Sequence, residues 1–404
     1  MNIISYLKQK GRRRVFQVVW RYKIPEIQIA LVSAITKKRP LEDKIVIESH
    51  NDFDCNGGAL YDWLIDNGFN EQVEIVWRLY HPVRSSDLPN NVSCVPVYGP
   101  SWKKAWAVCT AKWFTADCTV IDKVREDQLS IYMTHGGFGL KDCHGLIDIP
   151  SSVDYVLSAS SGLDDWTNWL YNLDPSKTKL AHVGFPSLER LCKRQHSRNY
   201  RFEPFEGKRI LWMPTFRQGV AYGRDDSAES YPYGVPLVRS KNDLDRLIAL
   251  LEGYGIQLVI KLHPKQDLSV ISGDLPNEIK FITGESIKED SVDNYDLMLD
   301  SDALISDYSG AIYEYMTLNR PIAFVLSDVG DYSLGLIEDA ERYMPGSKVY
   351  TFEDLARFID DVAKGLDPHK DERTEFLDWL YDPSSECSCS RVSELLGISG
   401  PNIA

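Results

Sequence analysis

Two histidines and one serine of this chain each stand at the end of a short apolar run. His135 follows Ile-Tyr-Met-Thr, His263 follows Val-Ile-Lys-Leu, and Ser309 follows Ala-Leu-Ile-Ser-Asp-Tyr. Apolar runs that stop abruptly in polar residues are typical of the carboxyl ends of strands, where open α/β sheets bind their ligands. Two imidazoles and a hydroxyl at such ends suit proton transfer on a substrate that carries phosphate.

Glycines follow the first of these histidines. Gly136 and Gly137 let the backbone approach a ligand closely and can turn N–H groups toward an anion. A histidine at this place can act as a general base, and the alternative is a histidine that only completes a tight turn. The sequence thus predicts His135 as a catalytic residue and the two glycines as phosphate-binding residues.

The other two strand ends offer further groups for a phosphate. Pro264 biases His263 toward an extended conformation, in which it can contact a phosphate oxygen or simply form a turn. Asp307, Ser309 and Gly310 lie between a predicted strand and a predicted helix, where free backbone N–H groups favour an anion. Asp307 or Ser309 can equally be the N-cap of that helix, and the two roles are compatible.

One more strand end carries Thr215 and Arg217, which follow Leu-Trp-Met-Pro. Both side chains can contact a phosphate, Arg217 in a bidentate way, and a surface Arg beside a domain linker is the alternative. Asp300 and Asp302 precede their strand, so we do not expect them to hold a metal ion, although a divalent metal requirement stays open. The cysteines lack zinc spacing and no Gly-x-Gly-x-x-Gly follows the first strand, so we expect neither zinc nor NAD or FAD.

Short apolar strands alternate with longer helical stretches along most of the chain, which predicts βα units and parallel sheets. The expected elements include a helix over residues 102–114, a strand over residues 118–121 and a helix over residues 311–318. A charged break without periodicity at residues 197–207 divides the pattern. A chain of 404 residues is longer than a domain with a single hydrophobic core usually is. We therefore expect two Rossmann-like domains, at residues 45–200 and 201–404.

Positive charge is concentrated at the start of the chain. The net charge is -14, but residues 1–44 hold eleven Lys or Arg residues against three acidic residues. Apolar residues at helical spacing in this segment predict an amphipathic helix that ends near Pro25. Such an arm favours attachment to an anionic membrane surface, and the alternative is a helix packed on its own domain. The acidic remainder argues against a nucleic-acid partner.

Two absences guide the expected location. No apolar run is long enough for a transmembrane helix, and the best run, Ile27 to Ile35, lacks the small-residue cleavage site of a signal peptide. The eight cysteines are scattered, which agrees with reduced thiols. We therefore expect a cytoplasmic protein that is peripheral on the inner face of the cell membrane.

The order of these motifs resembles the CDP-glycerol glycerophosphotransferase family, which builds wall teichoic acids and related capsules. The resembling stretches are Thr-His-Gly at 134–136, Met-Pro-Thr-Phe-Arg at 213–217, Lys-Leu-His-Pro at 261–264 and Asp-Ala-Leu-Ile-Ser-Asp-Tyr-Ser at 302–309. The resemblance implies two facing Rossmann-like domains of the GT-B type. It places the acceptor on the N-terminal domain and the CDP donor on the C-terminal domain.

The resemblance also implies a reaction. The enzyme would transfer a polyol phosphate from a CDP-activated donor to a hydroxyl of a polymer or lipid-linked acceptor and release CMP. Glycerol phosphate is the polyol phosphate that we expect most. His135 would be the base or orient the nucleophile, and His263 would stabilise the pyrophosphate and the leaving CMP. Ser309 and Arg391 would hold phosphate oxygens. Phosphoryl transfer needs such positioning and charge neutralisation more than covalent chemistry.

Two positions depart from the family pattern. Gly137 stands where the family commonly has Thr, and Gly310 stands where it commonly has a second Ser. Each change removes a hydroxyl from the expected phosphate site, so glycerol, ribitol and a sugar-containing unit all stay open. A GT-B glycosyltransferase that uses a CMP- or UDP-sugar is the alternative enzyme. A non-catalytic nucleotide- or polymer-binding protein is the alternative of another class.

Overall fold

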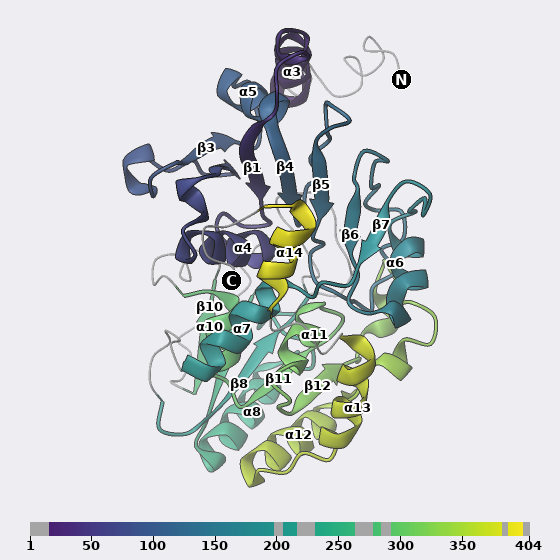
Figure 1. Cartoon of the computed structure of the whole chain (residues 1–404). Coiled ribbons are helices and arrows are strands. Elements are labelled where there is room, and N and C mark those ends of the chain that lie inside the picture. Colours follow the sequence, from purple (N-terminus) through teal and green to yellow (C-terminus); the bar gives the residue numbers. More distant parts are fainter. Residues whose placement is uncertain are drawn as a thin grey trace. The chain divides into compact units, whose positions relative to one another are not determined.

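A computed structural model describes residues 16–197, 205–215, 231–262, 278–283, 292–381 and 387–398. These residues form two compact α/β units, each built on its own parallel sheet (Figure 1). Unit 1 holds the described residues up to His135, residues 147–190 and the C-terminal helix. Unit 2 holds residues 136–146 and the described residues from 191 to 381.

Within the described residues, the sheet of unit 1 has seven parallel strands in the order β3-β2-β1-β4-β5-β6-β7. The strands are β1 (Glu42–Glu48), β2 (Glu74–Leu79), β3 (Val92–Pro96), β4 (Ala111–Ala116), β5 (Leu129–Tyr132), β6 (Tyr155–Leu157) and β7 (Lys179–Ala181). Ile45 of β1 pairs with Ile75 on one side and Trp113 on the other. The apolar centre of β1 is buried, as expected for a parallel sheet that is covered on both faces.

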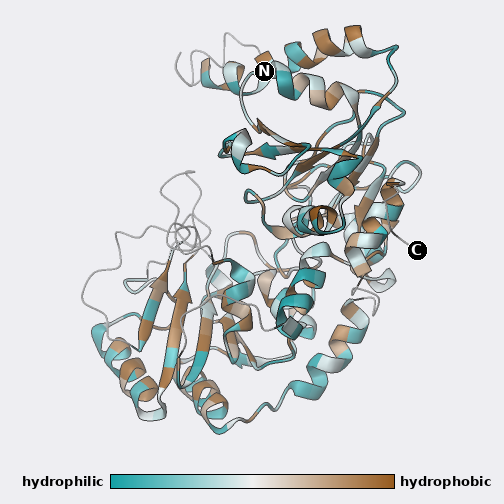
Figure 2. Ribbon diagram, turned by 60° about the vertical axis from the view of Figure 1, so that its left-hand side comes forward, coloured by the Kyte–Doolittle hydropathy of each residue, from teal (hydrophilic) through white to brown (hydrophobic). Residues whose placement is uncertain are grey.

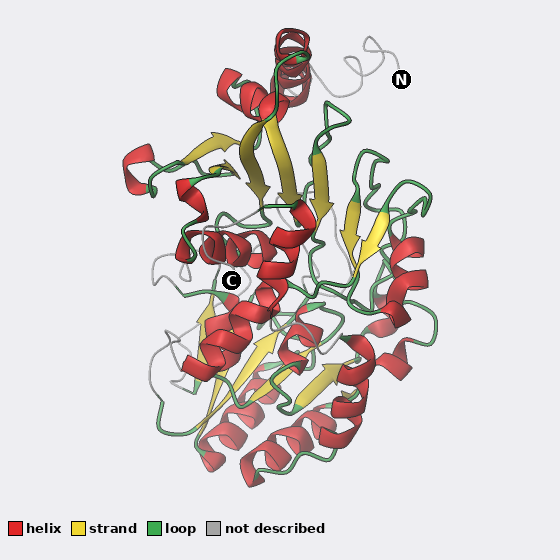
Figure 3. Cartoon of the chain, viewed as in Figure 1, coloured by secondary structure: helices red, strands yellow, loops and turns green. Residues whose placement is uncertain are grey.

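Helices lie between several strands of unit 1, before β1 and at the C-terminal end of the described chain (Figure 3). They are α3 (Ile24–Thr36), α4 (Cys55–Asp66), α5 (Trp102–Thr110), α6 (Asp164–Leu170), α7 (Pro186–Ser197), which continues into unit 2, and α14 (Ser388–Leu396), with 3₁₀ turns at Phe69–Glu71, Ser85–Asp87 and Ser161–Leu163. The Asp54 carboxylate accepts the Cys55 N–H (2.7 Å) where α4 begins. Gly68 adopts a left-handed φ of 70° just after α4, as helix ends often require.

The sheet of unit 2 has, in the described part of the chain, six parallel strands in the order β10-β9-β8-β11-β12-β13. The strands are β8 (Lys208–Met213), β9 (Ile256–Lys261), β10 (Ile279–Ile282), β11 (Ala303–Ser306), β12 (Ile322–Val325) and β13 (Ser347–Val349). The helices are α8 (Lys241–Tyr254), α10 (Asn294–Leu299), α11 (Ala311–Met316), α12 (Phe352–Lys364) and α13 (Lys370–Leu380), with 3₁₀ turns at Val329–Asp331 and Ala340–Tyr343. Figure 2 shows the apolar strands of this sheet beside helices that carry both polar and apolar residues.

A helical segment precedes β1. It runs from residue 16 through a π-helical turn (Val19–Lys23) into α3. The expectation that this helix ends near Pro25 is wrong, because Pro25 lies in the first turn of α3, where its missing N–H is not needed. α3 packs on α5 and buries Val32 against Ala105 and Cys109. No helix in the described ranges is both long and apolar enough to cross a membrane.

The two-unit parallel architecture confirms the predicted fold class, but one stretch was assigned wrongly. The expected helix over residues 102–114 ends at Thr110, and the strand expected at residues 118–121 is instead β4, at residues 111–116. Pairing with β1 draws Trp113 and Phe114 into the sheet, because aromatic residues fit a pleated surface flanked by other strands. The C-terminal helix α14 groups with unit 1, although the sequence placed it in the domain at residues 201–404.

Candidate active site

His135 lies beyond the carboxyl end of β5, which is separated from β1 by β4 in the sheet order. Thr134 and Gly136 on either side have left-handed φ values of 59° and 89°, a backbone that glycine adopts without strain. The amide of buried Asn56 donates to the carbonyls of Met133 and Thr134, both at 3.2 Å. These bonds fix the backbone that carries His135, whose side chain is exposed.

The structure brings two unpredicted side chains to His135. The His50 ring, just after β1, lies 4.2 Å from the His135 ring between centroids. The Cys55 Sγ, at the first residue of α4, lies 3.9 Å from His135 Nδ1. His50, Cys55 and His135 therefore form a cluster at the strand ends of unit 1.

A buried carboxylate fixes the backbone that carries part of this cluster. Asp117 follows β4 and accepts the N–H of His50 (2.7 Å) and the N–H of Gly57 (3.0 Å) on separate oxygens. It thereby ties the loop after β1 to the first turn of α4. Burial raises the pKa of Asp117 to about 7, and the two backbone donors oppose that rise.

The titration of Asp117 gives a prediction about stability. Its folded pKa lies above the ordinary 3.8, so the ionised form is disfavoured in the folded state. The stability of the wild type relative to Asp117→Asn should therefore fall as pH rises from about 4 to about 7 and stay constant above that range. Urea unfolding of both proteins between these pH values measures the difference. A difference that is independent of pH would contradict a raised pKa.

In unit 2, Asp307 and Thr215 meet at the neighbouring ends of β11 and β8. The Asp307 carboxylate accepts the Thr215 N–H (3.0 Å), the Thr215 hydroxyl (2.5 Å) and the Tyr308 N–H (2.6 Å). Asp307 and Thr215 are both buried. Through these hydrogen bonds, Asp307 holds the two strand ends together. This role is compatible with its charge, whereas a carboxylate that faced a phosphate directly would repel it.

A second buried carboxylate fixes the turn before Ser309. Asp328 follows β12 and accepts the hydroxyls of Tyr308 (3.0 Å) and Tyr231 (2.9 Å). Tyr308 is fully buried. The Ser309 hydroxyl accepts the Ala311 N–H at 3.4 Å, at the start of the six-residue helix α11. Gly310 is the N-cap residue of α11, and the buried Tyr308 therefore positions Ser309 directly before that cap.

The loop at residues 136–146 belongs to unit 2 and explains one departure from the family pattern. Phe138 packs on the rings of Tyr313 and Tyr343, with centroids 4.8 and 5.3 Å apart. A Cβ added at Gly310 would lie 3.2 Å from the Phe138 carbonyl oxygen, which is tighter than an ordinary contact. The glycine at position 310 thus accommodates the backbone of this loop.

Three expected site residues are not seen beside the strand ends described above. His263 and Arg217 lie outside the described residues. Arg391 lies on α14 in unit 1, where the Cys389 N–H donates to Glu189 at 2.7 Å. The described ranges contain no group of three His, Cys, Asp or Glu residues arranged to hold a metal ion.

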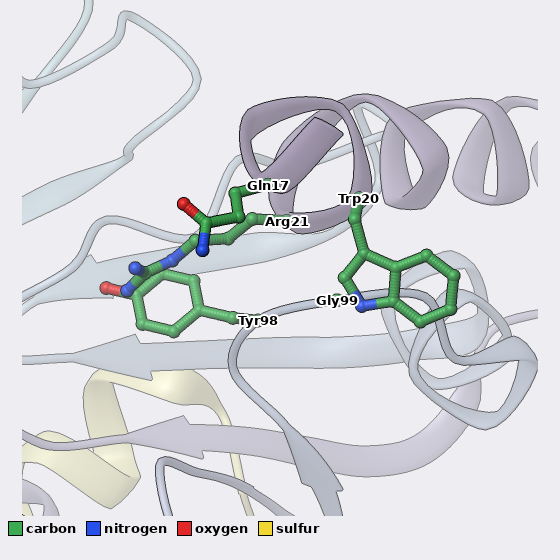
Figure 4. Close-up of a pocket in the computed structure, with 5 residues that line it drawn as sticks. All are labelled: Gln17, Trp20, Arg21, Tyr98 and Gly99. Carbon is green, nitrogen blue, oxygen red and sulfur yellow. The ribbon is translucent and has the colours of Figure 1, made fainter. Parts of the chain in front are cut away.

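A separate pocket lies at the N-terminal helical segment of unit 1 (Figure 4). It encloses about 500 Å³ and is lined by Gln17, Trp20, Arg21, Tyr98 and Gly99. The Arg21 guanidinium lies 3.4 Å from the centre of the Tyr98 ring, a cation–π contact. The pocket opens beside the exposed side chain of Trp20, on the part of the chain that carries the basic arm.

Known proteins resemble this chain over nearly its whole length. The teichoic acid poly(glycerol phosphate) polymerase of Bacillus spizizenii is 24% identical, over 94% of this chain and 99% of that protein. A teichoic acid glycerol-phosphate transferase of Staphylococcus aureus is 22% identical, over 88% of this chain and 92% of that protein. The chain spans only 31% of another relative, the Staphylococcus aureus ribitol-phosphate polymerase TarK.

Solved structures and a family model agree with these relatives. The wall teichoic acid polymerase TagF has the same fold, with a TM-score of 0.69, 19% identity and coverage of 98% of both chains. The model of the family described as CDP-Glycerol:Poly(glycerophosphate) glycerophosphotransferase matches residues 31–397. The predicted family, enzyme class and fold are therefore confirmed, and the chain belongs to the CDP-glycerol:poly(glycerophosphate) glycerophosphotransferase family.

Proposed function

We propose that this enzyme transfers glycerol phosphate from CDP-glycerol to a terminal hydroxyl of a glycerol-phosphate polymer and releases CMP. The match of the family model to residues 31–397 carries this proposal. Relatives covered almost completely by the chain are named as glycerol-phosphate polymerases and transferases, which favours glycerol over ribitol or a sugar. The match does not favour the glycosyltransferase alternative.

The proposed reaction assigns separate tasks to the two units. The acceptor oxygen attacks the β-phosphorus of CDP-glycerol, the bond to the CMP oxygen breaks, and the hydroxyl proton passes to His135. The exposed side chain and fixed backbone of His135 support this role. His263 is proposed to stabilise the pyrophosphate and the leaving CMP.

The remaining site residues are proposed to hold the donor phosphates. They are the backbone N–H groups of Gly136, Gly137 and Gly310, the hydroxyl of Ser309, and the guanidinium groups of Arg217 and Arg391. Thr215 and Asp307 act indirectly, because their mutual hydrogen bonds shape the strand ends beside Ser309.

A substrate panel tests the proposal. The full chain is incubated with an oligomeric glycerol-phosphate acceptor and with CDP-glycerol, CDP-ribitol or a UDP-sugar. We expect CMP release and acceptors longer by glycerol phosphate units, seen by mass spectrometry, with CDP-glycerol alone. Extension of the acceptor by ribitol phosphate or by a sugar would show that the proposed donor is wrong. Binding of a nucleotide without any product would show that the protein is a binding protein and not a transferase.

We also propose that the enzyme works as a peripheral protein on the inner face of the membrane. Ile27, Leu31 and Ile35 form one row on α3 and are 59%, 53% and 65% exposed. Trp102 and Trp106 lie one turn apart on neighbouring α5 and are also exposed. An exposed aliphatic row with tryptophans beside it suits the interface between lipid headgroups and acyl chains.

Basic residues accompany this apolar surface. Lys37, Lys38 and Arg39 follow α3 directly and are exposed, and the Arg39 guanidinium lies 5.5 Å from the Trp106 ring. Such residues attract an anionic bilayer by about 1 kcal/mol each. The proposed surface therefore combines α3 and residues 37–39 with α5.

Replacing Ile27, Leu31 and Ile35 by serine should abolish most binding to anionic vesicles. Their apolar side chains already face water, so the change removes burial in lipid and leaves the protein core intact. Sedimentation with phosphatidylglycerol vesicles measures binding. The control is Leu366→Ser, which replaces an exposed leucine of unit 2 and should leave binding unchanged. Unchanged sedimentation of the triple variant would place the membrane contact elsewhere on the protein.

A further inference from the structure

His50 and His135 form a closely packed pair of imidazoles in unit 1. Their ring centroids are 4.2 Å apart and their planes meet at 31°. Both side chains are exposed, so a surrounding core does not impose the contact. Their backbones, however, are fixed, because Asp117 accepts the His50 N–H and Asn56 holds the two carbonyls before His135.

We infer that His50 is a positioning residue for His135 in the transferase reaction, an inference that rests on the proposed function. The adjacent His50 ring fixes the plane of the His135 ring. Two imidazolium ions at this separation repel each other, so the pair binds one proton more readily than two. His135 therefore keeps a lone pair for the proton of the acceptor hydroxyl, and it releases that proton to solvent after transfer.

Other titratable groups surround the pair. Cys55 faces His135 from α4, and Asp117 lies beneath the His50 backbone. Two carboxylates of the loop before α4 have their own partners among the described residues. Asp52 accepts the N–H groups of Tyr80 and His81, and Asp54 pairs with Arg190 at 3.0 Å. None of these groups is altered by replacing His50, so a comparison of His50 variants isolates the second imidazole.

Two substitutions separate the roles of the His50 ring and its charge. His50→Phe keeps a ring that can pack on His135 but removes the titrating group, whereas His50→Ala removes both. His81→Phe is the matched control, since it removes an exposed imidazole that pairs with Asp52 in the same unit. The dependence of kcat/KM on pH is measured for CDP-glycerol with all three variants and the wild type.

We expect the acidic limb of the profile to move to higher pH by about 0.5–1 unit in both His50 variants, since one neighbouring positive charge is lost. On the plateau, His50→Phe should keep nearly wild-type kcat, and His50→Ala should lose about tenfold because the His135 ring is no longer fixed. His81→Phe should match the wild type. Wild-type profiles in both His50 variants, or equal losses in both at every pH, would overturn the inference.

A second measurement does not depend on turnover. The ring titration of His135 is followed by NMR in protein with ¹³C-labelled histidine, and its signal is identified by its loss in His135→Gln. The titration midpoint should lie at higher pH in His50→Phe than in the wild type. An unchanged midpoint would overturn the coupling of the two rings, even if the enzyme transfers glycerol phosphate. A shifted midpoint in a protein without transferase activity would instead reject the proposed function and retain the coupled pair.

Discussion

Replacing His135 by alanine is expected to lower turnover at least about 100-fold, the scale of a lost general base. The His135 side chain is exposed at the end of β5, so its removal leaves no cavity in the core. The backbone around it is held by the Asn56 amide, which the substitution does not touch. Release of CMP from CDP-glycerol measures turnover, and thermal unfolding followed by circular dichroism checks the fold.

Two further variants give this result its meaning. His135→Gln retains a hydrogen-bonding side chain but cannot accept a proton near neutral pH, so its turnover should be as low as that of His135→Ala. His196→Ala, an exposed histidine at the end of α7, should behave as the wild type. A folded His135→Ala protein with turnover close to the wild type would remove His135 from the proposed mechanism.

Replacing Asp307 by alanine is expected to destabilise the protein by about 3 kcal/mol or more. The substitution removes the hydrogen bonds that the Asp307 carboxylate accepts from the Thr215 N–H, the Thr215 hydroxyl and the Tyr308 N–H, and losing the acceptor of a buried donor costs about 1–3 kcal/mol. Urea unfolding gives the change in the free energy of unfolding. Asp378→Ala, at an exposed position of α13 in the same unit, should change it by less than about 0.5 kcal/mol.

The Thr215 hydroxyl provides an internal test of the same interaction. Thr215→Val removes only that donor, so the two substitutions should be strongly non-additive in a double-mutant cycle. If Asp307→Ala does not fold, Asp307→Asn retains one acceptor oxygen and should still lose stability. Wild-type stability of Asp307→Ala would show that the hydrogen bonds of Asp307 do not hold the two strand ends.

The strand-end pattern predicted some residues of the candidate site and missed others for identifiable reasons. His135 was found because it follows one apolar run, and Asp307 and Ser309 were found because they follow another. Asp117 was missed because its strand was placed at residues 118–121, after the aspartate, instead of before it. His50 follows β1 closely, but its proximity to His135 depends on the sheet order β1-β4-β5, which the local pattern does not contain.

Contacts between distant segments were also beyond the sequence pattern. A side chain at position 310 would crowd the carbonyl oxygen of Phe138, which lies about 170 residues earlier in the chain. Sequence comparison therefore registered a missing hydroxyl at position 310, whereas the structure gives a steric reason for its absence. The direct roles of Gly136, Gly137, Ser309 and Arg391 in binding the donor stay predictions, as do the indirect roles of Thr215 and Asp307.

The membership of α14 in unit 1 has a consequence for the order of events during protein synthesis. Val392 and Leu396 of α14 are buried, and α14 contacts α4, which begins more than 300 residues earlier. While the ribosome is still translating unit 2, the nascent unit 1 has its full sheet but an uncovered apolar surface on α4. Unit 1 can complete its core only after residues 387–398 leave the ribosome exit tunnel. Until then, chaperones that recognise exposed apolar surface have a binding site on it.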